Sequence, residues 1–247
     1  MIPKVIHYCW FGRNPLPKLA IRCIESWKKH LPDYKIIEWN EDNFNVNIIP
    51  YTAEAYRAKK FAFVSDYARF WILHKYGGLY FDTDVEIIRP INDIITKGPF
   101  MGFEQPSEEV KQTSSALYDV APGLALGATP GLAIYKELLD HYQNLHFLGN
   151  DGKPIPVTIV KHTTDVLKTK GLIPNNTLQK IAGVWIYPWD VFCPQSYWTK
   201  KYNASSNTVS IHHYSDSWNS ARAKFLDHVF KRHPWIKPIY FKIRKFI

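Results

Sequence analysis

Alternation of short apolar segments with helix-forming segments is the feature that most limits the folds open to this chain. Strand-like and helix-like segments take turns over residues 2–10, 18–30, 34–39, 52–76 and 79–81. The pair Gly77-Gly78 stands where the second helix needs a C-terminal cap. This order predicts an α/β domain with a mostly parallel central sheet. Ligands of such sheets bind beyond the carboxyl ends of the strands, where Trp10 and Asp82 are expected.

Further elements are expected in the second half of the chain, with less regular spacing. The pattern predicts a helix over 130–147 and a strand over 208–211, whereas 104–122 reads as a polar loop and 149–156 as a turn-rich connection. With 247 residues, of which 46% are hydrophobic, the chain can bury one substantial core. We therefore expect a single catalytic domain.

Cysteine usage and apolar runs bear on the compartment. Three cysteines in no metal-binding or disulfide spacing indicate a reducing environment. The N-terminal residues do not resemble a signal peptide, and no apolar run of about 18 residues occurs. We expect a soluble or peripheral protein of the cytoplasm.

The net charge of +9 is concentrated at the C-terminal end. Residues 222–247 carry eight basic side chains and one acidic one, mixed with aromatic and aliphatic residues. Such a tail is typical of segments that lie on anionic membranes, here at the cytoplasmic face of the membrane. A packed helix with a solvated basic face explains it equally well. The same charge would attract nucleic acid, but we expect no nucleic-acid partner.

Two carboxylates follow the strand at 79–81 directly. In extended backbone alternate side chains point the same way, so Asp82 and Asp84 can face one site. Two hard oxygen donors suit Mn²⁺ or Mg²⁺, which keep open positions for phosphate oxygens. A lone DxD is a weak signal, because many solvated loops contain one.

Two further groups of polar residues strengthen the DxD signal. Ser65, Asp66 and Arg69 share part of one helix surface, where they could bind sugar hydroxyls and phosphate or form a plain surface ion pair. His212 and His213 end a strand, ahead of Ser217 and Trp218. One imidazole could complete a metal site, although paired histidines are often structural.

The ordered motifs resemble glycosyltransferase family 32. They are Ile2-Pro3-Lys4-Val5-Ile6-His7, Trp10-Phe11-Gly12, Trp39-Asn40, Ser65-Asp66-Tyr67-Ala68-Arg69, Gly77-Gly78-Leu79-Tyr80-Phe81-Asp82-Thr83-Asp84, His212-His213 and Ser217-Trp218. The family includes bacterial capsule and surface polysaccharide transferases and shares its DxD region with fungal mannosyltransferases. More distantly, the same blocks are similar to the glucosyltransferase domain of large clostridial toxins.

The resemblance implies a GT-A fold over 1–221, a nucleotide-sugar donor, Mn²⁺ or Mg²⁺, and hexose transfer with retention to a glycan or lipid-linked oligosaccharide. A UDP-sugar is the expected donor, although the sequence does not fix the nucleotide. Its implied roles are base stacking for Trp10, donor binding for Asp66, Arg69, Asp82, Ser217 and Trp218, and metal binding for Asp84 and His212 with Asp82 beside them. Catalysis would rest on Asp66, Arg69, Asp82 and Asp84. His212 is preferred to His213 because it holds the more usual motif position.

Two positions depart from the family pattern or lack a role. Relatives often carry an asparagine near the first glycine of Pro122-Gly123, and this chain does not. Glu104 matches a family glutamate whose role the sequence does not disclose.

Two rival functions follow from the same residues. A haloacid-dehalogenase-like phosphatase also places Asp-x-Asp after an apolar strand, but it expects Thr or Val where this chain has Glu86. A non-catalytic carbohydrate or polyanion binder would use the aromatic residues and the basic tail without a metal.

Overall fold

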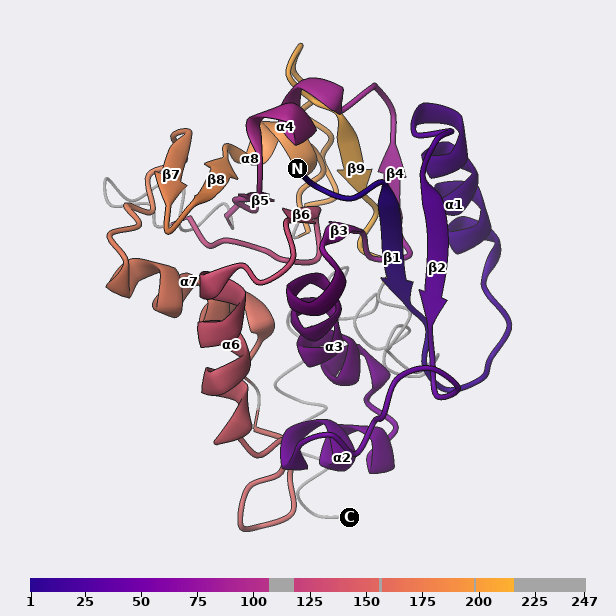
Figure 1. Cartoon of the computed structure of the whole chain (residues 1–247), viewed down its shortest axis with the longest axis vertical. Helices are drawn as coiled ribbons and strands as arrows, with labels where there is room; N and C mark the ends of the chain where they lie inside the picture. The colour runs from indigo at the N-terminus through magenta and orange to yellow at the C-terminus, as the bar shows by residue number, and fades with distance from the viewer. Residues whose placement is uncertain (107–117, 156, 198, 216–247) are drawn as a thin grey trace, which may run out of the picture. The chain divides into compact units, whose positions relative to one another are not determined.

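A computed structural model describes residues 1–106, 118–155, 157–197 and 199–215 (Figure 1). The segment Met1–Tyr214 forms one compact unit. Its elements are β1 (Val5–Cys9), α1 (Lys18–His30), β2 (Lys35–Trp39), α2 (Pro50–Arg57), α3 (Phe61–Tyr76), β3 (Gly78–Tyr80), β4 (Val85–Ile87), α4 (Asn92–Lys97), β5 (Phe100–Gly102), β6 (Leu126–Ala128), α6 (Ala133–Gln143), α7 (Ile159–Thr169), β7 (Gln179–Ile181), β8 (Val184–Tyr187), α8 (Trp189–Phe192) and β9 (Ser210–His212).

A seven-stranded sheet in the order β2-β1-β3-β6-β5-β8-β7 forms the centre of this unit. Strands β2, β1, β3, β5 and β8 point one way, while β6 and β7 run opposite to their neighbours. The predicted α/β class with a mostly parallel sheet is confirmed. The carboxyl ends of β1, β2, β3, β5 and β8 therefore share one edge, which is where the motif residues gather. A separate two-stranded ladder joins β4 to β9.

The predicted elements agree with the structure to different degrees. The helix over Lys18–His30 is confirmed to the residue. The single helix expected over 52–76 is wrong, because α2 ends at Arg57 and α3 begins at Phe61. Between them Lys59 has a left-handed backbone, with φ of 56°. The intervening residues are good helix formers, so no glycine or proline marks the break. The predicted cap is present: Gly77 has φ of 64° and donates its N–H to the Leu73 carbonyl.

Helix α3 is the central helix of the unit. Figure 1 shows it between the sheet and the helices α2 and α6. Its buried residues lie on most sides of the helix, whereas α1 buries one face only. The two charged residues in the buried part of α3, Asp66 and Arg69, must therefore be paired within the protein.

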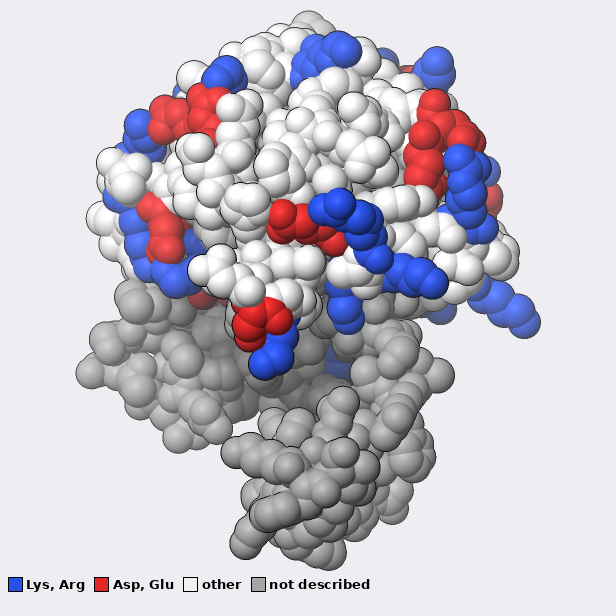
Figure 2. Space-filling view, turned by 90° about the horizontal axis from the view of Figure 1, so that it is seen from below, with Lys and Arg blue, Asp and Glu red and all other residues white. Residues whose placement is uncertain are grey.

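The charged side chains of the described surface are mixed in sign. On the face seen in Figure 2, blue and red groups lie next to one another, with broad uncharged areas between them. No helix among the described residues is long and apolar enough to cross a bilayer. The basic tail predicted over 222–247, and its boundary at residue 221, lie outside the described residues.

His7 fixes the contact between β1, β2 and the end of α3. Its Nδ1 accepts from the Trp39 indole at 3.0 Å, and its Nε2 lies 3.0 Å from the Gly77 carbonyl oxygen. An indole can only donate, so Nδ1 is the acceptor and Nε2 carries the proton. Burial lowers the pKa of His7 to about 4, although the Gly77 carbonyl opposes the shift.

We expect His7 to make stability depend on pH. The unfolded chain protonates histidine as the pH falls through about 6.5, whereas folded His7 resists protonation down to about pH 4. The unfolded state binds more protons in that window, so stability present above pH 6.5 is lost as the pH falls, by about 3 kcal/mol. Urea unfolding at pH 7 and pH 4.5 should show a drop that is about 2 kcal/mol or more smaller in His7→Gln. Equal drops in both proteins would contradict this assignment.

Candidate active site

A buried arginine organises the site. Arg69 is 3% exposed, and its Nε donates to the Ser65 carbonyl one turn earlier at 3.1 Å. Its Nη2 lies 3.1 Å from the Asp66 carboxylate, which is 7% exposed. The alternative of an exposed surface pair is therefore wrong, and the weak energetics of such pairs do not apply.

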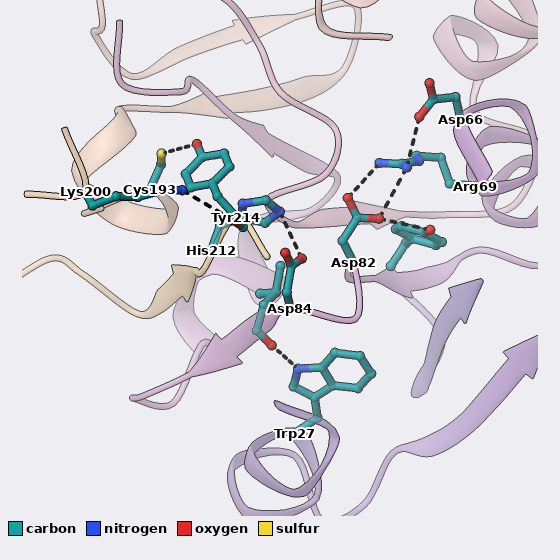
Figure 3. A network of polar contacts seen from close by, with 11 residues as sticks. Trp27, Asp66, Arg69, Asp82, Asp84, Cys193, Lys200, His212 and Tyr214 are labelled. Atoms are coloured by element: carbon teal, nitrogen blue, oxygen red, sulfur yellow. Dashed lines mark hydrogen bonds and ion pairs between the residues drawn. The ribbon is translucent and has the colours of Figure 1, made fainter. Parts of the chain in front are cut away.

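The same guanidinium reaches the first aspartate of the DxD. Nη2 and Nη1 of Arg69 lie 3.2 and 3.4 Å from the two carboxylate oxygens of Asp82. The Tyr80 hydroxyl donates to Asp82 at 3.2 Å, and its ring lies 4.9 Å from the guanidinium carbon. Figure 3 shows Arg69 between Asp66 and Asp82. We call Asp66, Arg69, Tyr80 and Asp82 the arginine clamp.

Burial and neighbouring charges shift the pKa values of the clamp residues in opposite directions. Burial raises the pKa of Asp66 to about 7, Arg69 lowers it, and the nearby Asp82 charge raises it further. Burial also raises the pKa of Asp82, again against the effect of Arg69. The two carboxylates raise the pKa of Arg69, although burial acts in the other direction. One cation thus serves two carboxylates, and removing it would leave the buried Asp66 and the partly exposed Asp82 without a counter-charge.

Gly123 covers the outer side of Asp82. A Cβ atom at this position would stand 2.4 Å from the Asp82 carboxylate and 3.5 Å from the Arg69 guanidinium. A side chain here would push the carboxylate out of the clamp. The Gly123 backbone thus lies directly against Asp82.

Asp84 points away from the clamp, toward His212. The His212 Nε2 lies 3.2 Å from Asp84 Oδ1, and the two side chains are 12% and 13% exposed. The β4–β9 ladder aligns Val85 with His212, and the His213 N–H donates to the Asp84 carbonyl at 2.9 Å. Residues far apart in the sequence are thus brought together by backbone pairing.

His213 has a different set of partners. Its Nε2 lies 2.7 Å from Glu86 and 3.3 Å from the Arg22 guanidinium. These contacts tie β9 to β4 and α1, away from Asp84. The structure therefore places His212, as preferred from the motif position, on the side of the second DxD aspartate. Glu86, which occupies the position where a phosphatase of this type expects Thr or Val, is the residue that His213 contacts.

Several site residues carried no recognisable signal in the sequence. Trp27 of α1 is fully buried and donates from its indole to the Val85 carbonyl at 2.7 Å, which anchors the chain beside Asp84. The Tyr214 ring packs 4.2 Å from the His212 ring, and its hydroxyl lies 2.9 Å from the Cys193 sulfur. Both residues appear in Figure 3. An apolar helix position and a tyrosine after a motif are too common in sequences to single out.

The other predicted site residues lie at the same sheet edge or outside the described chain. Trp10 follows β1 and lines a cavity of about 260 Å³. Glu104 follows β5 and lies close enough to Asp119 and His212 for their charges to act on it. Burial, then the Asp119 charge, raises the pKa of Glu104 to about 7, although His212 opposes the shift. Ser217 and Trp218 lie outside the described residues.

Asp84 and His212 fit one side of a divalent-metal site. A carboxylate oxygen and an imidazole nitrogen 3.2 Å apart can both bind one ion. Within the described ranges no three His, Cys, Asp or Glu side chains are grouped closely enough to enclose one. Mn²⁺ and Mg²⁺ suit such an open site, because they commonly bind one or two protein groups together with substrate phosphates and water. Asp82, by contrast, pairs with Arg69 as part of the arginine clamp.

Comparison with known proteins agrees with this geometry. Residues 17–101 match the family model described as "Glycosyltransferase sugar-binding region containing DXD motif". The matched region contains α3 and the DxD segment. The resemblance to DXD glycosyltransferases that the motifs indicate is thereby confirmed, and the mostly parallel sheet agrees with the GT-A fold that it implies.

Two curated relatives from Schizosaccharomyces pombe are mannosyltransferases. Inositol phosphoceramide mannosyltransferase 1 is 28% identical over 111 residues, which are 40% of this chain and 33% of that protein. Inositol phosphoceramide mannosyltransferase 3 is 26% identical over 150 residues, which are 59% of this chain and 40% of that protein. The chain thus spans less than half the length of these relatives.

Two solved structures to which this chain is similar carry the word glycosyltransferase in their names. The PaToxG glycosyltransferase is 19% identical, with 69% of this chain and 70% of that chain covered and a TM-score of 0.47. A glycosyltransferase involved in the glycosylation of the major capsid of PBCV-1 is 13% identical, with 92% of this chain and 98% of that chain covered and a TM-score of 0.48.

The two neighbouring histidines should differ in their effect on metal binding. We expect His212→Ala to weaken Mn²⁺ binding at least about tenfold, because it removes a nitrogen beside Asp84. His213→Ala is the matched control and should stay within about threefold, because His213 contacts Glu86 instead. Titration of free Mn²⁺ by electron paramagnetic resonance measures both. An equal loss in the two variants would overturn the assignment.

Proposed function

We propose that this chain is a metal-dependent glycosyltransferase that moves a hexose from a nucleoside-diphosphate sugar to a glycan or lipid-linked acceptor. The observation that carries the proposal is the position of the DxD segment. Asp82 is held by the arginine clamp on one side, and Asp84 meets His212 on the other. The match of residues 17–101 to a DXD sugar-binding region supports the same activity.

The two aspartates have separate tasks in this proposal. Breaking the bond between the anomeric carbon and the diphosphate requires stabilisation of the charge that develops on the leaving group. Asp84 and His212 would hold Mn²⁺ or Mg²⁺, which supplies that stabilisation when bound. Asp66 and Asp82 would accept hydrogen bonds from donor-sugar hydroxyls through oxygen lone pairs that Arg69 leaves open.

Arg69 has a different role here from direct phosphate binding. Its Nε, Nη1 and Nη2 all donate to protein acceptors, namely Ser65, Asp82 and Asp66. We infer that Arg69 positions the two carboxylates before the sugar arrives. Pre-set groups need little reorganisation during the reaction, and this is the usual origin of electrostatic catalysis.

The stereochemistry and the setting of the reaction belong to the proposal as well. We propose retention by a front-face route, in which the leaving phosphate accepts the acceptor proton. A product with inverted anomeric configuration in its NMR spectrum would exclude this route. Peripheral contact with the inner face of a bacterial cell membrane, through the basic tail 222–247, would suit a lipid-linked acceptor.

The activity is tested by incubating nucleoside-diphosphate sugars with the protein and Mn²⁺, with and without EDTA. We expect one donor to be hydrolysed slowly, because water replaces the acceptor. Asp84→Asn should lower that rate about 100-fold or more, since it removes a charge that holds the metal. The exposed Asp93→Asn, on α4, is the matched control and should leave the rate unchanged. If the protein binds nucleotide sugar equally well with EDTA present and in the Asp84→Asn variant, a non-catalytic binder would be favoured instead.

A further inference from the structure

The cavity beside Trp10 lies at the carboxyl ends of β1 and β2, next to the strand that carries the DxD. It has a volume of about 260 Å³ and is lined by Trp10, Arg13, Asn14, Glu38, Asn40 and Glu41. Pockets for complete small ligands are usually about 300 to 1,000 Å³. The cavity therefore suits one part of a nucleotide sugar rather than all of it.

The charges of the lining identify that part. Two carboxylates, Glu38 and Glu41, line the cavity, and the guanidinium of Arg13 is paired with Asp42, with Nη2 and Oδ1 2.5 Å apart. A diphosphate would be repelled by such a wall. An uncharged base that offers N–H donors would be attracted, and the flat Trp10 indole gives it a surface for stacking.

Glu38 and Glu41 differ in how far their oxygens are already used. Glu38 accepts from the Tyr8 hydroxyl at 2.7 Å with one oxygen and from the Asn40 amide at 2.9 Å with the other. Glu41 accepts from the Gly12 N–H at 2.7 Å and the Tyr56 hydroxyl at 2.9 Å, both through Oε1. Its Oε2 is withdrawn from water and accepts no hydrogen bond from another of the described residues.

An unpartnered buried carboxylate oxygen is costly, and a donor on an occupant of the cavity would relieve it after a small rotation of the carboxylate. Guanine offers two adjacent donors, N1–H and the N2 amino group. Uracil offers one, N3–H, with a carbonyl oxygen on either side that would face the carboxylate. Cytosine and adenine each offer only an exocyclic amino group.

We propose that Glu41 selects guanine, so that the donor is a GDP-sugar. This inference rests on the proposed transferase function and deepens it. It replaces the expectation of UDP, which depends on the resemblance alone and on no residue of the base cavity. Trp10 would stack on the base, and Glu41 would read its donor edge.

Calorimetric titration of GDP, IDP and UDP with Mn²⁺ present tests the selection. IDP is GDP without the N2 amino group. We expect GDP to bind at least about tenfold more tightly than UDP, with IDP between them, because a hydrogen bond to a charged group is at stake. In Glu41→Gln an amide N–H can take the place of the accepting oxygen, and GDP should bind within about threefold of IDP.

Asp33→Asn is the control, because Asp33 is exposed, pairs with Lys4 and does not line the cavity. It should leave the ratio of GDP to UDP affinity unchanged, and thermal melting of both variants checks that they fold. Equal or tighter binding of UDP by the wild type would overturn the guanine proposal and leave the transferase proposal standing. If Glu41→Gln still distinguishes GDP from IDP and UDP as well as the wild type does, the proposed role of Glu41 is overturned. If no nucleotide binds in the presence of Mn²⁺, both proposals fail.

Discussion

The contact of one buried guanidinium with two carboxylates is the interaction on which the rest of this site depends. Arg69 is almost inaccessible to water, and so is Asp66. Burying these charges is costly unless each is paired and hydrogen-bonded. The pairing constrains α3 and the end of β3 together, because a shift of either would separate Arg69 from Asp82. The Gly123 backbone closes the remaining side.

A second constraint fixes the other half of the site. Asp84 follows the clamp by two residues, but its partner His212 arrives from the far end of the described chain through the β4–β9 ladder. Trp27 anchors β4 by donating a hydrogen bond to the Val85 carbonyl, and Glu86 of β4 contacts His213, which follows β9. The DxD segment thus joins the arginine clamp to the pair Asp84 and His212, which we propose as the metal-binding groups. This division explains why its two aspartates face different partners.

Local sequence patterns predicted the elements that motifs mark and missed those set by tertiary contacts. The cap at Gly77 is recognisable from the sequence, because a backbone position with positive φ favours glycine. Lys59 also has a positive φ, but no local signal marks it, so the sequence pattern predicts one helix where two exist. Spacing and resemblance point to Asp66, Arg69, Asp82, Asp84 and His212, and the structure brings Arg69 against Asp66 and Asp82, and His212 against Asp84. Sequence spacing does not show that Arg69 pairs with both Asp66 and Asp82. It also does not show that Trp27 and Tyr214 pack against the site, because these contacts arise only when the chain folds.

The most direct test of the arginine clamp is the rate at which the Arg69→Lys variant hydrolyses the nucleotide sugar that the wild type uses. Lysine keeps the charge but cannot bridge two carboxylates with a planar fork of donors. The account predicts a fall in kcat of about 100-fold, with circular dichroism and Mn²⁺ binding close to those of the wild type. A variant that keeps its rate within about threefold would contradict the claim that Arg69 sets the positions of Asp66 and Asp82.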